Sequence, residues 1–384
     1  MNAKTLIILL ILTAAAVWGV FELQQRTSPP VRSLEARTLY PGLQDQLNEV
    51  TAVRVFAAGD TLAAALQRSD DGWVVTSAHD YPADLATLRA QLLALAQARV
   101  IESKTDDPAR YPQLGVQDLE GGDAPGVRIE VDGPEPAPRL IVGEEATSGV
   151  GQVYVRPQGE ARSLLVEGNI DPPREARNWL RQPIVDIPGD TVQQVTIRHA
   201  DGETLTLVRE SREQTNLTPE SLPPERELDY ASVANPVGSA LAGLQLESVR
   251  PAAELPPDQR VSLAKADFLT FDGRHLRAEL FEIDGQRYLT LAAGFDAEQH
   301  QRFAVTEEAA GENTDESGPE AETEESPAEA IAALDQRLQG WAYTVSDYEF
   351  DNLTRRLEDL LKPPEESAET GIDDASTPAP APAE

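Results

Sequence analysis

Cysteine is absent from this chain of 384 residues, and positive charge is scarce, with 32 lysines and arginines against 66 aspartates and glutamates. Without cysteine the protein has no disulfide, no thiol nucleophile, no thiolate metal site and no lipidated cysteine of a bacterial lipoprotein. The formal net charge of −34 repels polyanions, so the composition argues against nucleic acid as a partner and gives the soluble part no attraction to anionic headgroups.

Signatures of catalysis are also missing. No Gly-x-Ser-x-Gly elbow occurs, and Gly149-Val150-Gly151 lacks the lysine and the following helix of a phosphate loop. In a chain this acidic, close pairs of carboxylates arise by chance. The four histidines have no metal-ligand spacing and are expected to be solvated: His79, His199, His275 and His300. The sequence therefore predicts a protein that is not an enzyme and has no cofactor and no bound metal.

An apolar stretch near the amino terminus predicts a membrane anchor. Residues 5–23 are apolar apart from Thr13 and Glu22, and as a helix they reach about 28 Å, close to the thickness of a bilayer core. Lys4 before the stretch and the acidic bulk after it predict a cytoplasmic amino terminus and a periplasmic remainder at a bacterial inner membrane. A cleaved signal peptide is the alternative, because residues 14–16 are three alanines.

The clearest helix signal begins after Asp84, whose side chain can cap the first turn. Leu85, Leu88, Leu92 and Leu95 recur at the spacing of one helical face, which predicts an amphipathic helix. Period-two alternation of apolar residues before and after this helix predicts strands of an antiparallel sheet. We expect residues 24–48 to link the anchor to this first unit, which covers residues 49–185.

The order of strands and helix recurs in a second unit, expected over residues 186–362. The segment from Asp229 stands where the segment from Asp84 stood, and interior Pro236 and Gly238 predict a kink or a late start in this second helix. Three later segments are matched with the first unit: Phe281 to Gly285 with Ile129 to Gly133, Tyr288 to Leu291 with Leu140 to Val142, and Trp341 to Val345 with Gln152 to Val155. A duplication this long predicts two similar domains in tandem.

Two acidic segments fit neither unit. Residues 306–330, rich in glutamate, are predicted to form a disordered insertion just before the last helix and strand of the second unit, and residues 363–384 a disordered acidic Pro/Ala tail. A calcium loop is the functional alternative for the insertion, but the required order of oxygen ligands is missing. The fold class is thus α+β: an N-terminal transmembrane helix and two tandem units, each an antiparallel β-sheet with one packed amphipathic helix.

Several of these features resemble the domain of unknown function 4340 family. The residues that carry the resemblance are Asp71-Gly72-Trp73, the capped helix from Asp84, Arg99-Val100-Ile101, Tyr111-Pro112-Gln113-Leu114-Gly115-Val116, and the strands ending in Gly143 and Val155. The resemblance implies a membrane-anchored bacterial protein that accompanies an ABC-type transport system with components similar to those of gliding-motility transporters. It implies no catalytic residues.

These observations predict a non-catalytic, inner-membrane-anchored periplasmic accessory protein of an ABC-type export or envelope system, which acts through protein contacts, with a permease or an auxiliary envelope protein as partner. The loop after the first helix, with Tyr111, Leu114 and Gly115, is the predicted partner contact, and an ordinary packed turn is the alternative. A binding module for a small molecule or glycan between the two units is the second hypothesis, and an enzyme the third. The oligomeric state stays open.

Overall fold

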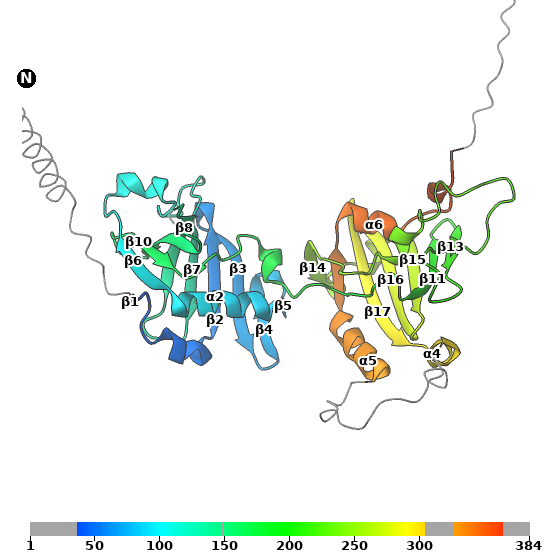
Figure 1. Cartoon of the computed structure of the whole chain (residues 1–384), viewed down its shortest axis with the longest axis horizontal. Coiled ribbons are helices and arrows are strands. Elements are labelled where there is room, and N and C mark those ends of the chain that lie inside the picture. Colours follow the sequence, from blue (N-terminus) through cyan, green and yellow to red (C-terminus); the bar gives the residue numbers. More distant parts are fainter. Residues whose placement is uncertain (1–36, 148, 304–325, 364–384) are drawn as a thin grey trace, which may run out of the picture. The chain divides into compact units, whose positions relative to one another are not determined.

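The computed structural model describes residues 37–147, 149–303 and 326–363 and divides the chain into two compact units, with the boundary between Arg181 and Gln182 (Figure 1). The predicted boundary after residue 185 is a few residues late. Residues 182–185 belong to unit 2, because the Ile184 amide donates to the Leu244 carbonyl at 2.9 Å and the Leu244 amide donates to Val185 at 2.9 Å. The predicted anchor at residues 5–23 lies outside the described residues and stays a prediction. Within the described ranges, no helix is long and apolar enough to cross a membrane.

Unit 1 is built on a ten-stranded antiparallel sheet with the order β1-β6-β10-β9-β8-β7-β2-β3-β4-β5. The strands are β1 (Arg37–Thr38), β2 (Ala52–Ala57), β3 (Thr61–Ser69), β4 (Gly72–Val75), β5 (Tyr81–Pro82), β6 (Arg99–Ser103), β7 (Val127–Asp132), β8 (Arg139–Glu145), β9 (Gln152–Pro157) and β10 (Leu164–Glu167). Helix α2 (Leu85–Gln97) lies across this sheet (Figure 1). The short 3-10 helices of unit 1 include η1 (Leu43–Glu49), η4 (Pro108–Gln113) and η5 (Ala176–Trp179).

Helix α2 forms as its sequence predicts. The Asp84 carboxylate accepts from the Ala86 amide at 2.9 Å and from the Thr87 hydroxyl at 2.6 Å, so the first turn is capped. Leu88, Leu92 and Leu95 are buried, whereas Leu85, expected on the same buried face, is 40% exposed. The helix therefore contributes its middle and its end to the core and leaves its first turn at the surface.

The predicted linker at residues 24–48 extends too far into the chain. Strand β1 pairs with β6, with Arg37 opposite Val100, and Leu43 in η1 is buried. Residues 37–48 are thus part of unit 1, because a two-residue strand and a 3-10 helix carry little periodicity and cannot be recognised from the sequence.

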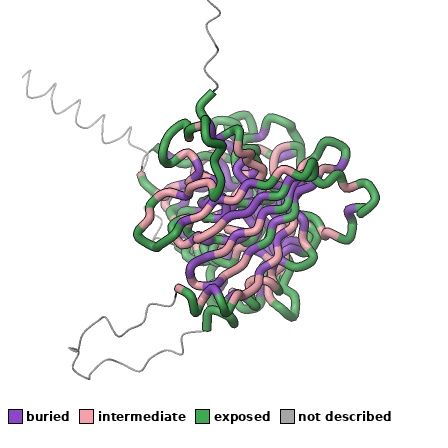
Figure 2. The backbone as a smooth tube through the Cα atoms, turned by 90° about the vertical axis from the view of Figure 1, so that its right-hand side faces the viewer, coloured by how far each residue is buried: buried purple, intermediate pink, exposed green. Residues whose placement is uncertain are grey.

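Unit 2 is built on an eight-stranded antiparallel sheet with the order β13-β12-β11-β15-β16-β17-β18-β14. The strands are β11 (Val192–His199), β12 (Thr204–Val208), β13 (Thr218–Pro219), β14 (Ser248–Pro251), β15 (Val261–Thr270), β16 (Arg274–Ile283), β17 (Gln286–Phe295) and β18 (Trp341–Thr344). Buried and less buried positions alternate along the long strands β15 to β17, as expected for strands with one face in the core (Figure 2).

The two sheets share an order of neighbouring strands. Read in the order β14-β18-β17-β16-β15-β11-β12-β13, unit 2 has the same sequence of neighbours as β6-β10-β9-β8-β7-β2-β3-β4 in unit 1. The predicted strand matches are nevertheless displaced by one strand. Strand β7 corresponds to β15 rather than to the end of β16, and β18 corresponds to β10 rather than to β9. The reason is that β15-β16 and β16-β17 both turn at an Asp-Gly pair, Asp272-Gly273 and Asp284-Gly285, so the pattern has two equivalent fits.

The helix expected from Asp229 is wrong for most of its length. Only α3 (Asn235–Gly238) is helical, a single turn that begins one residue before Pro236. The expected late start is confirmed, and the rest of the segment forms turns because Gly238 and Gly243 interrupt it. Helix α3 packs against β11 and against α6 (Asp347–Leu353).

The amphipathic helix on the sheet of unit 2 is α5 (Pro327–Leu338), which packs against β17 and β16 and buries Ile331 and Leu338. Ser326 and Glu329 form a capping box at its start. The predicted disordered insertion at residues 306–330 therefore ends too late, since residues 326–330 are ordered; residues 304–325 lie outside the described residues. A shorter helix, α4 (Ala297–Phe303), follows β17.

Candidate functional site

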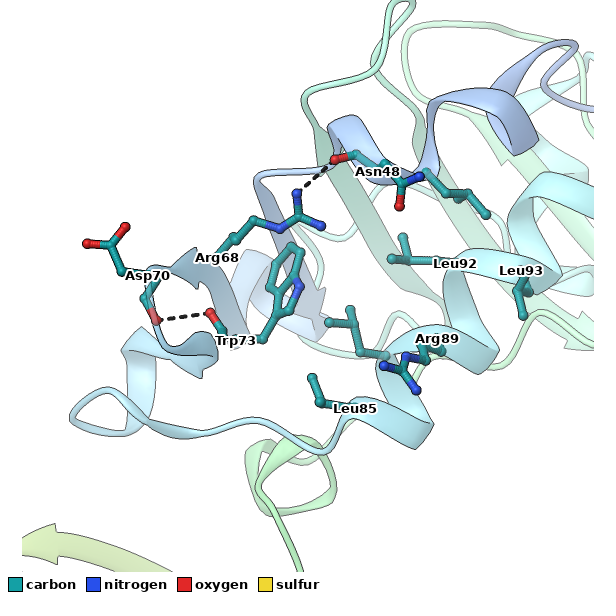
Figure 3. Close-up of a pocket in the computed structure, with 12 residues that line it drawn as sticks. Asn48, Arg68, Asp70, Trp73, Leu85, Arg89, Leu92 and Leu93 are labelled. Carbon is teal, nitrogen blue, oxygen red and sulfur yellow. Dashed lines mark hydrogen bonds between the residues drawn. The ribbon is translucent and has the colours of Figure 1, made fainter. Parts of the chain in front are cut away.

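A groove with a volume of about 580 Å³ opens on unit 1 between α2, the β3-β4 hairpin and the end of η1. Figure 3 shows Arg68 and Trp73 on the hairpin side and Leu85, Arg89, Leu92 and Leu93 on α2. The lining residues are Leu47, Asn48, Arg68, Ser69, Asp70, Gly72, Trp73, Leu85, Leu88, Arg89, Leu92 and Leu93. The groove therefore lies where the interface between α2 and the sheet reaches the solvent.

The floor of the groove is apolar. Leu88 and Leu92 are buried beneath it, while Leu85 and Leu93 are 40% and 43% exposed along its helical side. On the opposite side the half-buried indole of Trp73 stands on β4. Burial of apolar surface is favourable by about 25 cal/mol per Å², so this floor offers binding energy to any apolar group that covers it.

Two arginines flank the apolar floor. Arg68 Nη1 donates to the Asn48 carbonyl at 2.8 Å, and its guanidinium carbon lies 5.6 Å from the centre of the Trp73 ring. Within the described part of the chain this is the only hydrogen bond of the Arg68 side chain, and Arg89 has neither a hydrogen bond nor an ion pair. The only carboxylate in the lining is that of Asp70. The groove therefore holds an excess of unused N–H donors in a protein whose net charge is −34.

The register of the two sheets identifies the counterpart of Arg68 in unit 2. Arg68 lies two residues after Leu66, which pairs with Val53, and Arg209 lies two residues after Leu207, which pairs with Val195. The Arg68 amide donates to the Thr51 carbonyl, and the Arg209 amide donates to the Gln193 carbonyl. Arg68 and Arg209 thus occupy the same position in the duplicated fold.

Arg209 is enclosed, unlike Arg68. It is 4% exposed, and its guanidinium donates to four main-chain carbonyls, those of Gly189 (2.9 Å), Asp190 (3.2 Å), Val192 (2.6 Å) and Thr215 (3.1 Å). Burial lowers the pKa of Arg209, because desolvation disfavours the charged form. Nη1 and Nη2 of Arg209 are therefore engaged within unit 2, while its buried Nε has no hydrogen-bond partner among the described residues, and the side chain of Arg68 makes a single hydrogen bond within unit 1.

The predicted partner contact occupies a different part of unit 1. Tyr111 is buried, its hydroxyl donates to the Ala161 carbonyl, and the Arg156 guanidinium lies 4.8 Å from its ring centre. Gly115 is also buried, has φ +69°, and leaves only 3.1 Å between an added Cβ and Glu144. The exposure on which the prediction rested is thus wrong for both residues, and the packed-turn alternative describes them. Tyr111 is buried because its ring packs in one apolar cluster with Val116 and Ile141.

Leu114 is the member of this set that reaches a surface depression. It is half-buried and lines an open, polar hollow of about 470 Å³ together with residues 102–106, Arg110 and Gln113. Lys104 in this hollow is already paired with Glu102 at 2.8 Å. The hollow lacks both the apolar floor and the unused cations of the groove at α2.

The histidines do not assemble into a site in the described residues, where no cluster of three or more histidine, aspartate or glutamate side chains could hold a metal ion. The expectation that all four are solvated is wrong for His199, which is buried and has its Nε2 3.3 Å from the Arg355 carbonyl oxygen. His275 lies 3.1 Å from Asp267 within a surface ion-pair cluster.

Sequence reasoning missed the groove, although one signal for it was available. The two-residue turn at Asp70-Asp71 places Arg68 opposite Trp73 on the hairpin, so this pair could have been inferred. The orientation of the β3-β4 hairpin relative to α2 depends on tertiary packing, which no local sequence pattern encodes.

The fold and groove define a class of protein with two duplicated antiparallel α+β units and an open apolar groove on the first. Residues 73–261 match the family model described as Domain of unknown function (DUF4340), which supports the resemblance found in the sequence. The match covers slightly less than half of the chain and runs from β4 of unit 1 to β15 of unit 2, so it spans parts of both units. Comparison with curated proteins and with solved structures gave no match.

Proposed function

We propose that this protein is a non-catalytic, periplasmic accessory component of an ABC-type export or envelope system, held at the inner membrane by residues 5–23, and that unit 1 binds a protein partner through the groove at α2. The observation that carries the proposal is the combination of exposed Leu85 and Leu93 with Trp73 and two arginines in one concave surface. Tryptophan and arginine in partly enclosed pockets supply much of the binding energy at protein interfaces.

The membrane and transport parts of the proposal rest on the sequence. The apolar length of residues 5–23 suits a bilayer, Lys4 favours a cytoplasmic amino terminus, and the family resemblance implies a transport system as the setting. A permease or an auxiliary envelope protein is the partner we expect.

Crosslinking in intact cells followed by purification from membranes tests this function. Wild-type protein should co-purify with a permease or another envelope protein, and Leu93→Asp should reduce that recovery at least tenfold. Leu222→Asp is the matched control, because Leu222 is a similarly exposed leucine on unit 2. Recovery of no envelope partner, or equal loss with both variants, contradicts the proposal.

The alternative function, a binding module for a small molecule or glycan between the two units, stays a prediction. A panel of metabolites and oligosaccharides screened for a rise in melting temperature distinguishes it from the accessory role, since a ligand that binds only the folded state stabilises it by mass action.

A further inference from the structure

We propose that the groove of unit 1 binds an extended, acidic peptide segment of the partner, which places a leucine-sized side chain on the apolar floor beside Trp73 and oxygen acceptors against Arg68 and Arg89. This inference rests on the proposed function and specifies the chemistry of what the groove binds.

Unit 2 provides the template for the acceptors. All four hydrogen-bond acceptors of the Arg209 side chain are main-chain carbonyls, and one of them belongs to Thr215, in the segment that leads into β13. One of these acceptors, the Asp190 carbonyl, has a direct counterpart in unit 1, the Asn48 carbonyl. Asp190 lies three residues before Gln193, which accepts from the Arg209 amide, and Asn48 lies three residues before Thr51, which accepts from the Arg68 amide. Arg68 lacks counterparts of the other three within the described residues. A bound peptide supplies carbonyls of this kind, because its main chain presents one acceptor per residue.

In unit 2 the equivalent space is closed. The register of β12 with β13, continued by one residue, places Leu217 opposite Arg209, as Trp73 lies opposite Arg68, and Leu217 is completely buried. It is buried because α3 presents Gly238, where an added Cβ would stand 2.4 Å from Leu217 Cδ1. In unit 1 the repeat places Leu93 at the position of Gly238.

The bulk of Leu93 and Trp73 has a direct consequence. Two large side chains stand where unit 2 has a glycine and a leucine, so helix and hairpin in unit 1 do not close over the arginine, and the space between them is the groove of about 580 Å³. The position of Leu217 is already taken by Trp73 in unit 1, so an apolar group from outside would instead cover the leucines of α2 beside Trp73. A volume of about 580 Å³ leaves room for a leucine-sized side chain there.

Charge selects an acidic segment. The charged residues of the lining are Arg68, Arg89 and Asp70, so the groove carries a net positive charge on a strongly acidic protein. An aspartate or glutamate within one or two residues of the apolar anchor reaches Arg89, which has no partner among the described residues. Arginine and carboxylate form charge-assisted hydrogen bonds, which are stronger than neutral ones.

Selection of a displayed library of random peptides on the purified full chain in detergent tests the inference. We expect enrichment of sequences that combine leucine or another large aliphatic residue with aspartate or glutamate one or two positions away. A synthetic peptide of the enriched sequence should bind at least tenfold more weakly to Arg89→Glu and to Leu93→Ser. The matched controls on unit 2, Arg250→Glu and Leu222→Ser, should bind it as the wild type does.

The outcomes separate this inference from the proposed function. Enrichment of no sequence, of sequences without acidic residues, or of peptides indifferent to Arg89→Glu overturns the peptide inference. If envelope partners in crosslinked membranes still depend on Leu93, the accessory function stands and the partner presents another kind of surface. If recovery of partners is also indifferent to Leu93, both proposals are wrong. Circular dichroism of each variant must match the wild type, because α2 carries both substituted residues.

Discussion

The two units share a strand order and differ in how they treat one arginine. In unit 2, Arg209 is buried against four carbonyls beneath Leu217 and α3, whereas in unit 1 the equivalent Arg68 lines an open groove with one hydrogen bond from its side chain. The duplicated fold therefore accepts both a closed and an open arrangement at this position. The closed copy uses the arginine for its own stability, and the open copy leaves its donors for another molecule.

The difference arises from few residues. A helix of 13 residues with Leu93 and Arg89 stands in unit 1 where unit 2 has one helical turn with Gly238, and Trp73 stands where unit 2 has Leu217. The larger side chains in unit 1 keep the helix from approaching the hairpin as closely as in unit 2, because side chains in a packed interior cannot overlap.

The largest effect is expected for Leu92→Asp, which places a carboxylate in the buried seam between α2 and the sheet. The substitution should destabilise unit 1 by roughly 4 kcal/mol, since a buried charge without a partner is costly. Denaturant unfolding of the full chain measures it. Leu93→Asp, one residue further and exposed, is the control and should cost less than about 1 kcal/mol. Near-wild-type stability of Leu92→Asp would contradict the packing of α2.

A paired substitution of the two equivalent arginines addresses the comparison directly. Arg209→Ala should destabilise unit 2 by about 3 kcal/mol, because several buried carbonyls lose their donor, while Arg68→Ala should destabilise unit 1 by about 1 kcal/mol or less. Thermal and denaturant unfolding of both variants measure the two free energies. Equal losses would mean that the open and closed environments do not differ energetically.

Substitutions at the two equivalent helix positions, Gly238 and Leu93, test whether side-chain size sets the spacing between helix and hairpin. Gly238→Leu should destabilise unit 2 by roughly 2 kcal/mol, because the new side chain overlaps Leu217. Leu93→Gly should cost only about 1 kcal/mol, the loss of helix propensity at an exposed position. Differential scanning calorimetry of the two variants gives both values, and a tolerated leucine at position 238 would show that α3 can move away.

The smallest effect concerns the turn of the first hairpin in unit 2. Arg356 donates to Asp201 at 2.8 Å, and this hydrogen bond lowers the pKa of Asp201, with a further contribution from the Glu203 amide. A carboxyl group with a lowered pKa stabilises the fold above its unfolded-state pKa, and this contribution is lost as the pH falls through the lower folded-state pKa. NMR titration should show the Asp201 pKa rising in Arg356→Gln. An unchanged pKa would leave the arginine without influence on this turn.

Much of the fold could be predicted from local patterns. The capped helix from Asp84, the alternating strands, the duplication, and the last helix and strand of unit 2 all follow from spacing along the chain. The exchange of one strand for its neighbour, β15 for β16, shows the limit of that reasoning. Two Asp-Gly turns in succession fit the pattern equally well, and only the pairing of β11 with β15 distinguishes them.

The candidate site was the less predictable part. Tyr111 looked exposed because loops usually are, yet its ring completes the core around Ile141. Arg68, Arg89 and Leu93 carry no local signal of a site, because the two elements that bring them together, the β3-β4 hairpin and α2, meet only in the tertiary structure.

The sequence by itself therefore determined the elements of this protein, their order and their repetition, because those depend on periods and turns that adjacent residues encode. Only the tertiary structure decided that Arg209 is buried and that Arg68 lines an open groove. That outcome depends on whether Leu93 and Trp73, twenty residues apart in the chain, can occupy the space that Gly238 and Leu217 share in the other copy.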